Sequence, residues 1–229
     1  SIPALFRGKQ LMITGDEHQL QPNDLYQIRW EEAENEEENL DIEIDSLLTL
    51  ANHYLPKTML KEHYRSESLD LINFSNQHFY NNELRLLPNF KTLNEHKSHL
   101  NYLKVDGIWE NNKNITEAYK ITELIHDLIL EGIENIGIVT FNAKQQECIQ
   151  DVLERSFDEK NISIPKQIFV KNIENVQGDE RDVIIFSIGY APSPSGKMSL
   201  HFGSLTTEKG ENRLNVAITR AKKEIYVVS

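Results

Sequence analysis

The sequence lacks several features that define whole classes of protein. It has one cysteine among 229 residues, so no disulfide forms within the chain and no cysteine cluster can hold zinc. No run approaches the roughly 18 uninterrupted apolar residues of a membrane-spanning helix, and residues 1–4 are not a basic region ahead of an apolar core. We therefore expect a soluble, cytoplasmic protein without a membrane segment, with Cys148 buried as a small hydrophobic residue in a reducing compartment.

Positive charge is also scarce, but the imbalance is local. The chain has 24 Lys and Arg against 36 Asp and Glu, a net charge of −12. Residues 31–45 hold nine acidic and no basic residues, and removing these nine charges from −12 leaves −3. Such a run is typical of a solvated loop, although it could also repel nucleic acid or bind a basic partner. A nucleic-acid partner is therefore not excluded by the net charge.

The hydrophobic pattern alternates between short apolar runs and helical periodicity. The runs predict strands at 10–14, 100–105, 136–140, 167–171, 182–189 and 224–228. The 3.6-residue periodicity predicts helices at 46–55, about 66–80, 115–131, 142–157 and about 212–222. Strands that alternate with helices of this length predict an α/β fold with a mainly parallel sheet covered by helices on both faces.

Two helices carry recognisable boundary residues. Asn142 is placed to cap the helix that follows it, with Gln145 at the third position as in a capping box. Gly132 is placed to end the helix before it. In the 66–80 helix the spacing directs Leu69, Ile72 and Phe79 inward.

Four polar clusters lie beside these elements, and each has an ordinary structural explanation when taken alone. Residues 15–22 follow a strand and read as a tight turn, although Gln19 could donate to a phosphate oxygen. Residues 63–66 combine a histidine, a tyrosine and an arginine at the start of a helix, where an anion would be attracted. Residues 172–182 are a glycine-containing polar link between strands, and residues 213–222 read as an amphipathic helix.

Together and in this order, the clusters resemble the superfamily 1 helicases. The resemblance is to the branch that contains the nonsense-mediated-decay RNA helicase and large bacterial helicase-like proteins. Residues 15–22 look like motif III, residues 63–66 like motif IV, residues 176–182 like motif V, and residues 213–221 like motif VI. The fold implied is RecA-like, of the P-loop NTPase type, but without a P-loop of its own.

The resemblance implies a role for each matching residue. Gln19, Arg65 and Arg220 would be catalytic, with Gln19 sensing the γ-phosphate and the two arginines acting as fingers that neutralise charge in the transition state. Tyr64 would stack on adenine and Glu180 would hold the ribose, with Gly178 and Arg213 also at the nucleotide. Contacts with single-stranded DNA or RNA would come from a second set: Thr140, Phe141, Asn142, Asn175 and Val176.

The chain also departs from the family pattern. Asn212 precedes Arg213 where many relatives have two arginines, Asp179 stands where a basic residue is common, and His63 stands where Gln is common. The sequence contains no Gly-x-x-x-x-Gly-Lys-Ser/Thr phosphate loop and no Asp-Glu-Ala-type motif ahead of residue 15.

These absences predict a piece of a longer ATP-dependent helicase. Residues 1–24 would be the tail of the first RecA-like domain and residues 25–229 the second, with an acidic loop at about 31–45. ATP and Mg²⁺ would be cofactors of the parent protein, and this chain, expected to be monomeric, would hydrolyse no ATP alone. The strand at 10–14, without its parent sheet, would be displaced, frayed or abnormally paired.

Two alternatives remain open at the level of sequence. A RecA-like domain can keep its fold as a non-catalytic scaffold or protein-interaction module, although two arginines facing a cleft count against this. A flavodoxin-like or phosphate-binding domain for a small molecule would need a glycine-rich loop after its first strand, and none is present.

Overall fold

The computed structural model describes residues 6–20, 46–86, 98–198, 202–206 and 209–229. They belong to two compact units, residues 1–59 and residues 60–229. No helix in the described ranges is both long enough and apolar enough to cross a membrane. The acidic run at 31–45 lies outside the described residues.

The first unit contains helix α2 (Leu47–Tyr54). The Ser46 hydroxyl accepts a hydrogen bond from the backbone N–H of Thr49 at 3.1 Å and so caps the amino end. The helix ends just before Pro56, which has no backbone donor to continue it. This confirms the helix predicted over 46–55.

The strand predicted at 10–14 is wrong for this chain. The backbone there is irregular, and Met12 is 89% exposed. A strand is stable only when a neighbour accepts and donates its backbone hydrogen bonds, and no described residue pairs with this segment. The irregular backbone agrees with the expectation that the segment is frayed.

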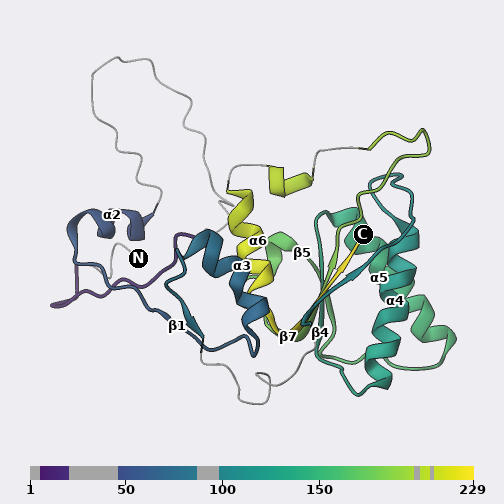
Figure 1. Ribbon diagram of the computed structural model, residues 1–229, viewed down its shortest axis with the longest axis horizontal. Coiled ribbons are helices and arrows are strands. Elements are labelled where there is room, and N and C mark those ends of the chain that lie inside the picture. Colours follow the sequence, from purple (N-terminus) through teal and green to yellow (C-terminus); the bar gives the residue numbers. More distant parts are fainter. Residues whose placement is uncertain (1–5, 21–45, 87–97, 199–201, 207–208) are drawn as a thin grey trace. The chain divides into compact units, whose positions relative to one another are not determined.

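The second unit is built on a sheet of five parallel strands in the order β3-β7-β6-β4-β5 (Figure 1). The strands are β3 (Leu100–Leu103), β4 (Ile136–Thr140), β5 (Phe169–Asn172), β6 (Arg181–Ser187) and β7 (Ala221–Val228). β6 is central, with Val183 opposite Ile136 of β4 and Ile184 opposite Ile225 of β7. The predicted α/β fold with a mainly parallel sheet is confirmed.

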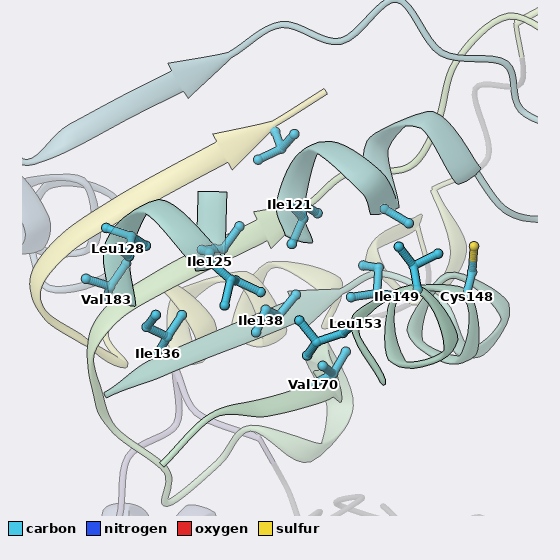
Figure 2. Close-up of a cluster of buried hydrophobic side chains, with 14 of the residues drawn as sticks. Ile121, Ile125, Leu128, Ile136, Ile138, Cys148, Ile149, Leu153, Val170 and Val183 are labelled. Atoms are coloured by element: carbon cyan, nitrogen blue, oxygen red, sulfur yellow. The ribbon is translucent and has the colours of Figure 1, made fainter. Parts of the chain in front are cut away.

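Helices cover both faces of this sheet. α4 (Ile115–Leu130) and α5 (Ala143–Glu159) pack together on one face, while α3 (Leu69–Phe79) and α6 (Gly210–Ile218) lie on the other (Figure 1). Figure 2 shows the core beneath α4 and α5, where side chains of both helices meet those of the strands. Its fully buried members include Ile121, Ile125, Ile136, Ile138 and Ile149.

The boundaries of α4 and α5 follow the sequence closely. Asn114 and Asn142 cap the two helices, accepting hydrogen bonds from the N–H groups of Glu117 and Gln145 at 3.1 and 2.9 Å. Gly132 has φ +85° just after α4, as predicted for the residue that ends it. The Gln145 side chain does not return to Asn142, however, so the reciprocal half of the predicted capping box is absent.

Two local predictions need correction, and one short pair of strands has no counterpart in the sequence prediction. The helix predicted over 212–222 ends at Ile218, because residues 221–228 pair with β6 and β3 as strand β7. In α3, Leu69 is 50% exposed rather than inward, and Leu71, Ile72 and Ser75 are its buried residues. The two-residue strands β1 (Glu62–His63) and β2 (Arg85–Leu86) form a separate parallel pair that is too short to leave a periodic signal.

Candidate functional site

A cluster of charged side chains lies where β6 and β7 begin. The Glu180 carboxylate lies between two cations, with its Oε2 3.1 Å from Arg65 Nε and its Oε1 2.7 Å from Lys222 Nζ. Arg65 also donates from Nη1 to the Thr219 carbonyl at 3.3 Å. Segments that are 115 residues apart in the sequence therefore meet through one carboxylate.

Arg220 belongs to the same cluster but is almost completely buried, at 4% exposure. It occupies the turn between α6 and β7, not the helix that the sequence predicts. Its Nε donates to the Val216 carbonyl at 2.8 Å, and its Nη2 donates to the Thr219 hydroxyl at 3.0 Å. Nη1 donates to the Asp179 carbonyl at 3.4 Å, so backbone and hydroxyl oxygens fix the guanidinium, and no carboxylate among the described residues forms an ion pair with it.

The His63–Ser66 segment is fastened to the start of β7. The Ser66 N–H donates to His63 Nε2 at 3.1 Å, and the Ser66 hydroxyl donates to the Ala221 carbonyl at 3.3 Å. The Glu67 N–H donates to the Lys222 carbonyl at 2.8 Å. These bonds hold Arg65 beside Glu180 and make His63 an acceptor, which requires its neutral form.

The electrostatics of the cluster follow from burial and from its surplus of cations. Burial, with Arg65 and Arg220 nearby, lowers the pKa of His63 to about 4. Burial and the Arg65 charge lower the pKa of Arg220 to about 10, which leaves it charged at neutral pH. Hydrogen bonds from Lys222 and Arg65 lower the pKa of Glu180, so the carboxylate stays ionised. Such a group of cations suits a polyphosphate.

The resemblance assigns three more residues to the nucleotide, and they do not share the hydrogen bonds of the charged cluster. Tyr64 adjoins Arg65 and is 88% exposed, so its ring is available for stacking. Gly178 is exposed with φ +88°, a conformation that favours glycine. Arg213 Nε lies 3.4 Å from Glu174 Oε1, so it pairs with the 3₁₀ helix η2 (Ile173–Asn175) after β5.

Gln19 lies in the first unit, in a polar turn. Its Nε2 donates to Asp16 Oδ2 at 2.9 Å, and its backbone N–H donates to the Asp16 carbonyl at 3.3 Å. The turn predicted for residues 15–22 is thus present in its described part.

The residues assigned to nucleic acid follow β4 and β5 at the carboxyl ends of these strands. The side chains of Thr140, Phe141 and Val176 are buried, at 0%, 5% and 0% exposure. A contact from these three positions would therefore come from the main chain. Asn142 is half-buried as the cap of α5, and Asn175 is exposed at the end of η2.

Sequence reasoning missed two features. The first is Lys222, which neutralises Glu180 although it matched no motif; its signal is the spacing of two residues from Arg220 that places it on β7. The second is a buried polar network around Glu117 in the first turn of α4. An acidic residue three positions after a capping Asn looks like an ordinary helix start, which hides it.

Asp179 also has a local explanation. Where relatives often carry a basic residue, its carboxylate lies 2.6 Å from Lys171 Nζ of β5. The Asp179 carboxylate is therefore neutralised by a lysine of the neighbouring strand.

Comparison with known proteins places the chain in a family. Residues 44–229 match the model of a family described as an AAA domain. Across 98% of its length the chain is 38% identical to an uncharacterized ATP-dependent helicase of Mycoplasma pneumoniae, of which it covers 21%. Across 98% of its length it is 27% identical to an uncharacterized ATP-dependent helicase of Methanocaldococcus jannaschii, of which it covers 33%.

A further similarity is confined to part of the chain. Half of the chain is 33% identical to the probable helicase senataxin of Mus musculus, over 4% of that protein. The chain thus spans about a fifth to a third of the two microbial relatives and a much smaller part of the mouse protein.

Proposed function

This chain belongs to the AAA domain family and is the C-terminal region of a superfamily 1 helicase, and from this premise we propose that it is the second motor lobe of an ATP-dependent helicase or translocase. In this proposal residues 1–24 are the tail of the first motor lobe and residues 25–229 are the second. The lobe supplies arginine fingers to ATP and main-chain contacts to single-stranded DNA or RNA.

The convergence of Arg65 and Arg220 carries the proposal. Two guanidinium groups that repel each other are held at the start of β6 and β7, Arg65 by the Glu180 carboxylate and a carbonyl oxygen, and Arg220 by carbonyl and hydroxyl oxygens. Holding like charges together costs free energy unless an anion offsets it. A γ-phosphate is the anion that this pair fits, and a finger of this kind contributes on the order of 10³ to 10⁵ in rate.

The remaining roles are assigned around this pair. Tyr64 is exposed and adjacent, as a residue that stacks on adenine should be, and Glu180 with Gly178 would meet the ribose. Gln19 would sense the γ-phosphate from the tail of the first lobe, and Arg213, which pairs with Glu174, would also lie at the nucleotide. We assign the phosphate loop and the Mg²⁺ ligands to the first lobe, because this sequence contains neither of the corresponding motifs.

The test is ATP hydrolysis by the longer protein that contains this chain, with and without single-stranded DNA or RNA. Arg220→Ala should lower the stimulated rate by on the order of 10³. The matched control is Arg155→Ala, because Arg155 is exposed on α5. We expect the control to keep the wild-type rate and the 229-residue chain alone to show no turnover.

Two results would contradict the proposal. ATP turnover by residues 1–229 at ordinary enzyme rates would contradict the assignment to a second lobe. Absence of turnover by the longer protein with every nucleic acid would favour a non-catalytic RecA-like scaffold instead.

A further inference from the structure

The carboxylate of Glu117 is completely buried, at 0% exposure, in the first turn of α4. The Ser187 hydroxyl donates to its Oε1 at 2.5 Å, and the Gly189 N–H lies 3.0 Å from both carboxylate oxygens. No cation in the described part of the chain lies within salt-bridge distance of it. Its hydrogen bonds therefore hold the end of β6 and the turn that follows, and both of these donors are uncharged.

The network closes through α5. Gln145 Nε2 donates to the Ser187 hydroxyl at 3.1 Å and to the Asn114 carbonyl at 3.2 Å. In return the Asn114 N–H donates to Gln145 Oε1 at 2.7 Å. Because Asn114 also caps α4 at Glu117, the amino ends of two helices and the end of one strand are joined by satisfied hydrogen bonds.

The turn held by Glu117 carries an aromatic stack. Gly189 has φ +77°, and a Cβ there would lie 3.1 Å from Trp109 Cζ3. The Trp109 ring packs at a tilt on Tyr190 with centroids 4.6 Å apart, and the backbone N–H of Trp109 donates to the Pro192 carbonyl at 3.1 Å. The turn therefore has little freedom to move without disturbing Trp109.

The same turn adjoins the residues assigned to nucleic acid. A Cβ on Gly203 would lie 2.9 Å from the Phe141 carbonyl and 3.1 Å from the Tyr190 hydroxyl, so Phe141 and Tyr190 flank one glycine. Phe141 also stacks on Phe186 of β6, with centroids 6.2 Å apart. The loop after β4 and the turn after β6 thus form one continuous edge, and the Glu117 network is fixed to both.

We propose that Glu117 is a positioning residue for nucleic-acid binding, which holds the 189–192 turn and the amino end of α5 in the arrangement that receives a single strand. The inference rests on the proposed function, because it assigns to that edge the strand contacts described above. Burying a carboxylate costs more free energy than burying an apolar side chain of similar size. A carboxylate buried so completely therefore favours a role in fixing the geometry of the groups that it binds.

The experiment uses the 229-residue chain with Trp30→Phe, which leaves Trp109 as its single tryptophan. Binding of a labelled oligo-dT is measured by anisotropy, and Trp109 emission reports on the turn. Glu117→Gln keeps the size of the side chain but places an amide donor against the Gly189 N–H. We expect roughly tenfold weaker binding, the equivalent of one hydrogen bond to a charged group, together with a shifted Trp109 emission and faster amide exchange at Gly189.

The matched control is Glu123→Gln on the exposed face of α4, which should change neither affinity nor emission. Affinities are compared at a temperature where urea unfolding shows each variant to be fully folded, so a loss of stability alone does not change them. If Glu117→Gln does not fold, Ser187→Ala removes the hydrogen bonds of the hydroxyl with Glu117 and Gln145 but leaves the Gly189 N–H on the carboxylate, and it should give a smaller loss in the same direction.

The outcomes separate the two proposals. Equal affinities for wild type and a folded Glu117→Gln would overturn this inference and leave the proposed function standing. Failure of the wild-type chain to bind any single-stranded nucleic acid would overturn both.

Discussion

The two ends of strand β6 support opposite kinds of polar chemistry. At its amino end Glu180 forms ion pairs with Arg65 and Lys222, and all three side chains are partly exposed. At its carboxyl end Glu117 is buried and is bound by a hydroxyl and a backbone N–H. With seven residues at about 3.3 Å each, the strand keeps the two regions roughly 20 Å apart.

The difference shows how one sheet serves two tasks. Exposed ion pairs are worth little and are remade easily, which suits a place where an anion must displace one partner. Buried hydrogen-bonded networks are costly to disturb, which suits a place where geometry must not vary. The ion pairs at the amino end of β6 can therefore be exchanged for others, while the hydrogen-bonded network at its carboxyl end keeps its geometry.

The two regions also differ in how the stability of the fold depends on pH, because each shifts the pKa of one titratable group and the two shifts affect stability in opposite directions. Burial raises the pKa of Glu117 to about 7, whereas burial and two arginines lower the pKa of His63 to about 4. Between their ordinary and shifted values the folded state binds more protons than the unfolded state at Glu117, and fewer at His63. Raising the pH thus destabilises the fold through one group and stabilises it through the other.

The largest expected effect comes from removing the buried acid. Glu117 contributes a free energy of unfolding that falls by about 3 kcal/mol as pH rises from 4.5 to 7, its ordinary and folded pKa values. Glu117→Gln removes this slope, so the variant should gain stability relative to wild type as pH rises. Urea unfolding across that window measures it, and parallel pH profiles for the two chains would contradict it.

A smaller effect of opposite sign is expected at His63. Its contribution is present above pH 6.5 and is lost as pH falls toward 4, and partial exposure limits it to about 1 to 2 kcal/mol. His63→Asn can still accept the Ser66 N–H but does not titrate, so it should lose less stability on acidification. His78→Asn, on the exposed part of α3, is the control and should follow wild type.

The smallest effect is expected for the Lys222–Glu180 pair. Both side chains are partly exposed, so Lys222→Met should change the free energy of unfolding by less than about 1 kcal/mol, and less still at high salt. Urea midpoints at low and high salt measure this. A loss above about 2 kcal/mol would mean that the charged end is as rigid as the buried one.

Most of the fold could be predicted from the sequence because its signals are local. Helices α4 and α5 have an apolar period and capping residues within a few positions, and strand β4 is a short continuous apolar run. The end of α6 could not be predicted, because Ala221 and its neighbours favour helix by themselves and become a strand only by pairing with β6. The segment at 10–14 fails for the converse reason, since no strand in the described ranges pairs with its apolar run.

The candidate site divides along the same line. The meeting of Arg65 with Glu180 spans 115 residues and follows from the order of the motifs, not from any periodicity. The Glu117 network spans 70 residues and has no motif, so only the folded chain brings its donors to the carboxylate. Local rules place a residue on its element, and distant partners decide what it does there.

The pairing of β6 has a mechanical consequence. From Val183 to Ser187 the strand is held in register by β4 on one side and β7 on the other, and a slip of one residue would turn every side chain to the opposite face of the sheet. Its pairing with β7 is irregular between Arg181 and Val183, next to Glu180. The one irregular part of this pairing thus lies beside the cations, while the stretch from Val183 onward is paired without interruption on both sides.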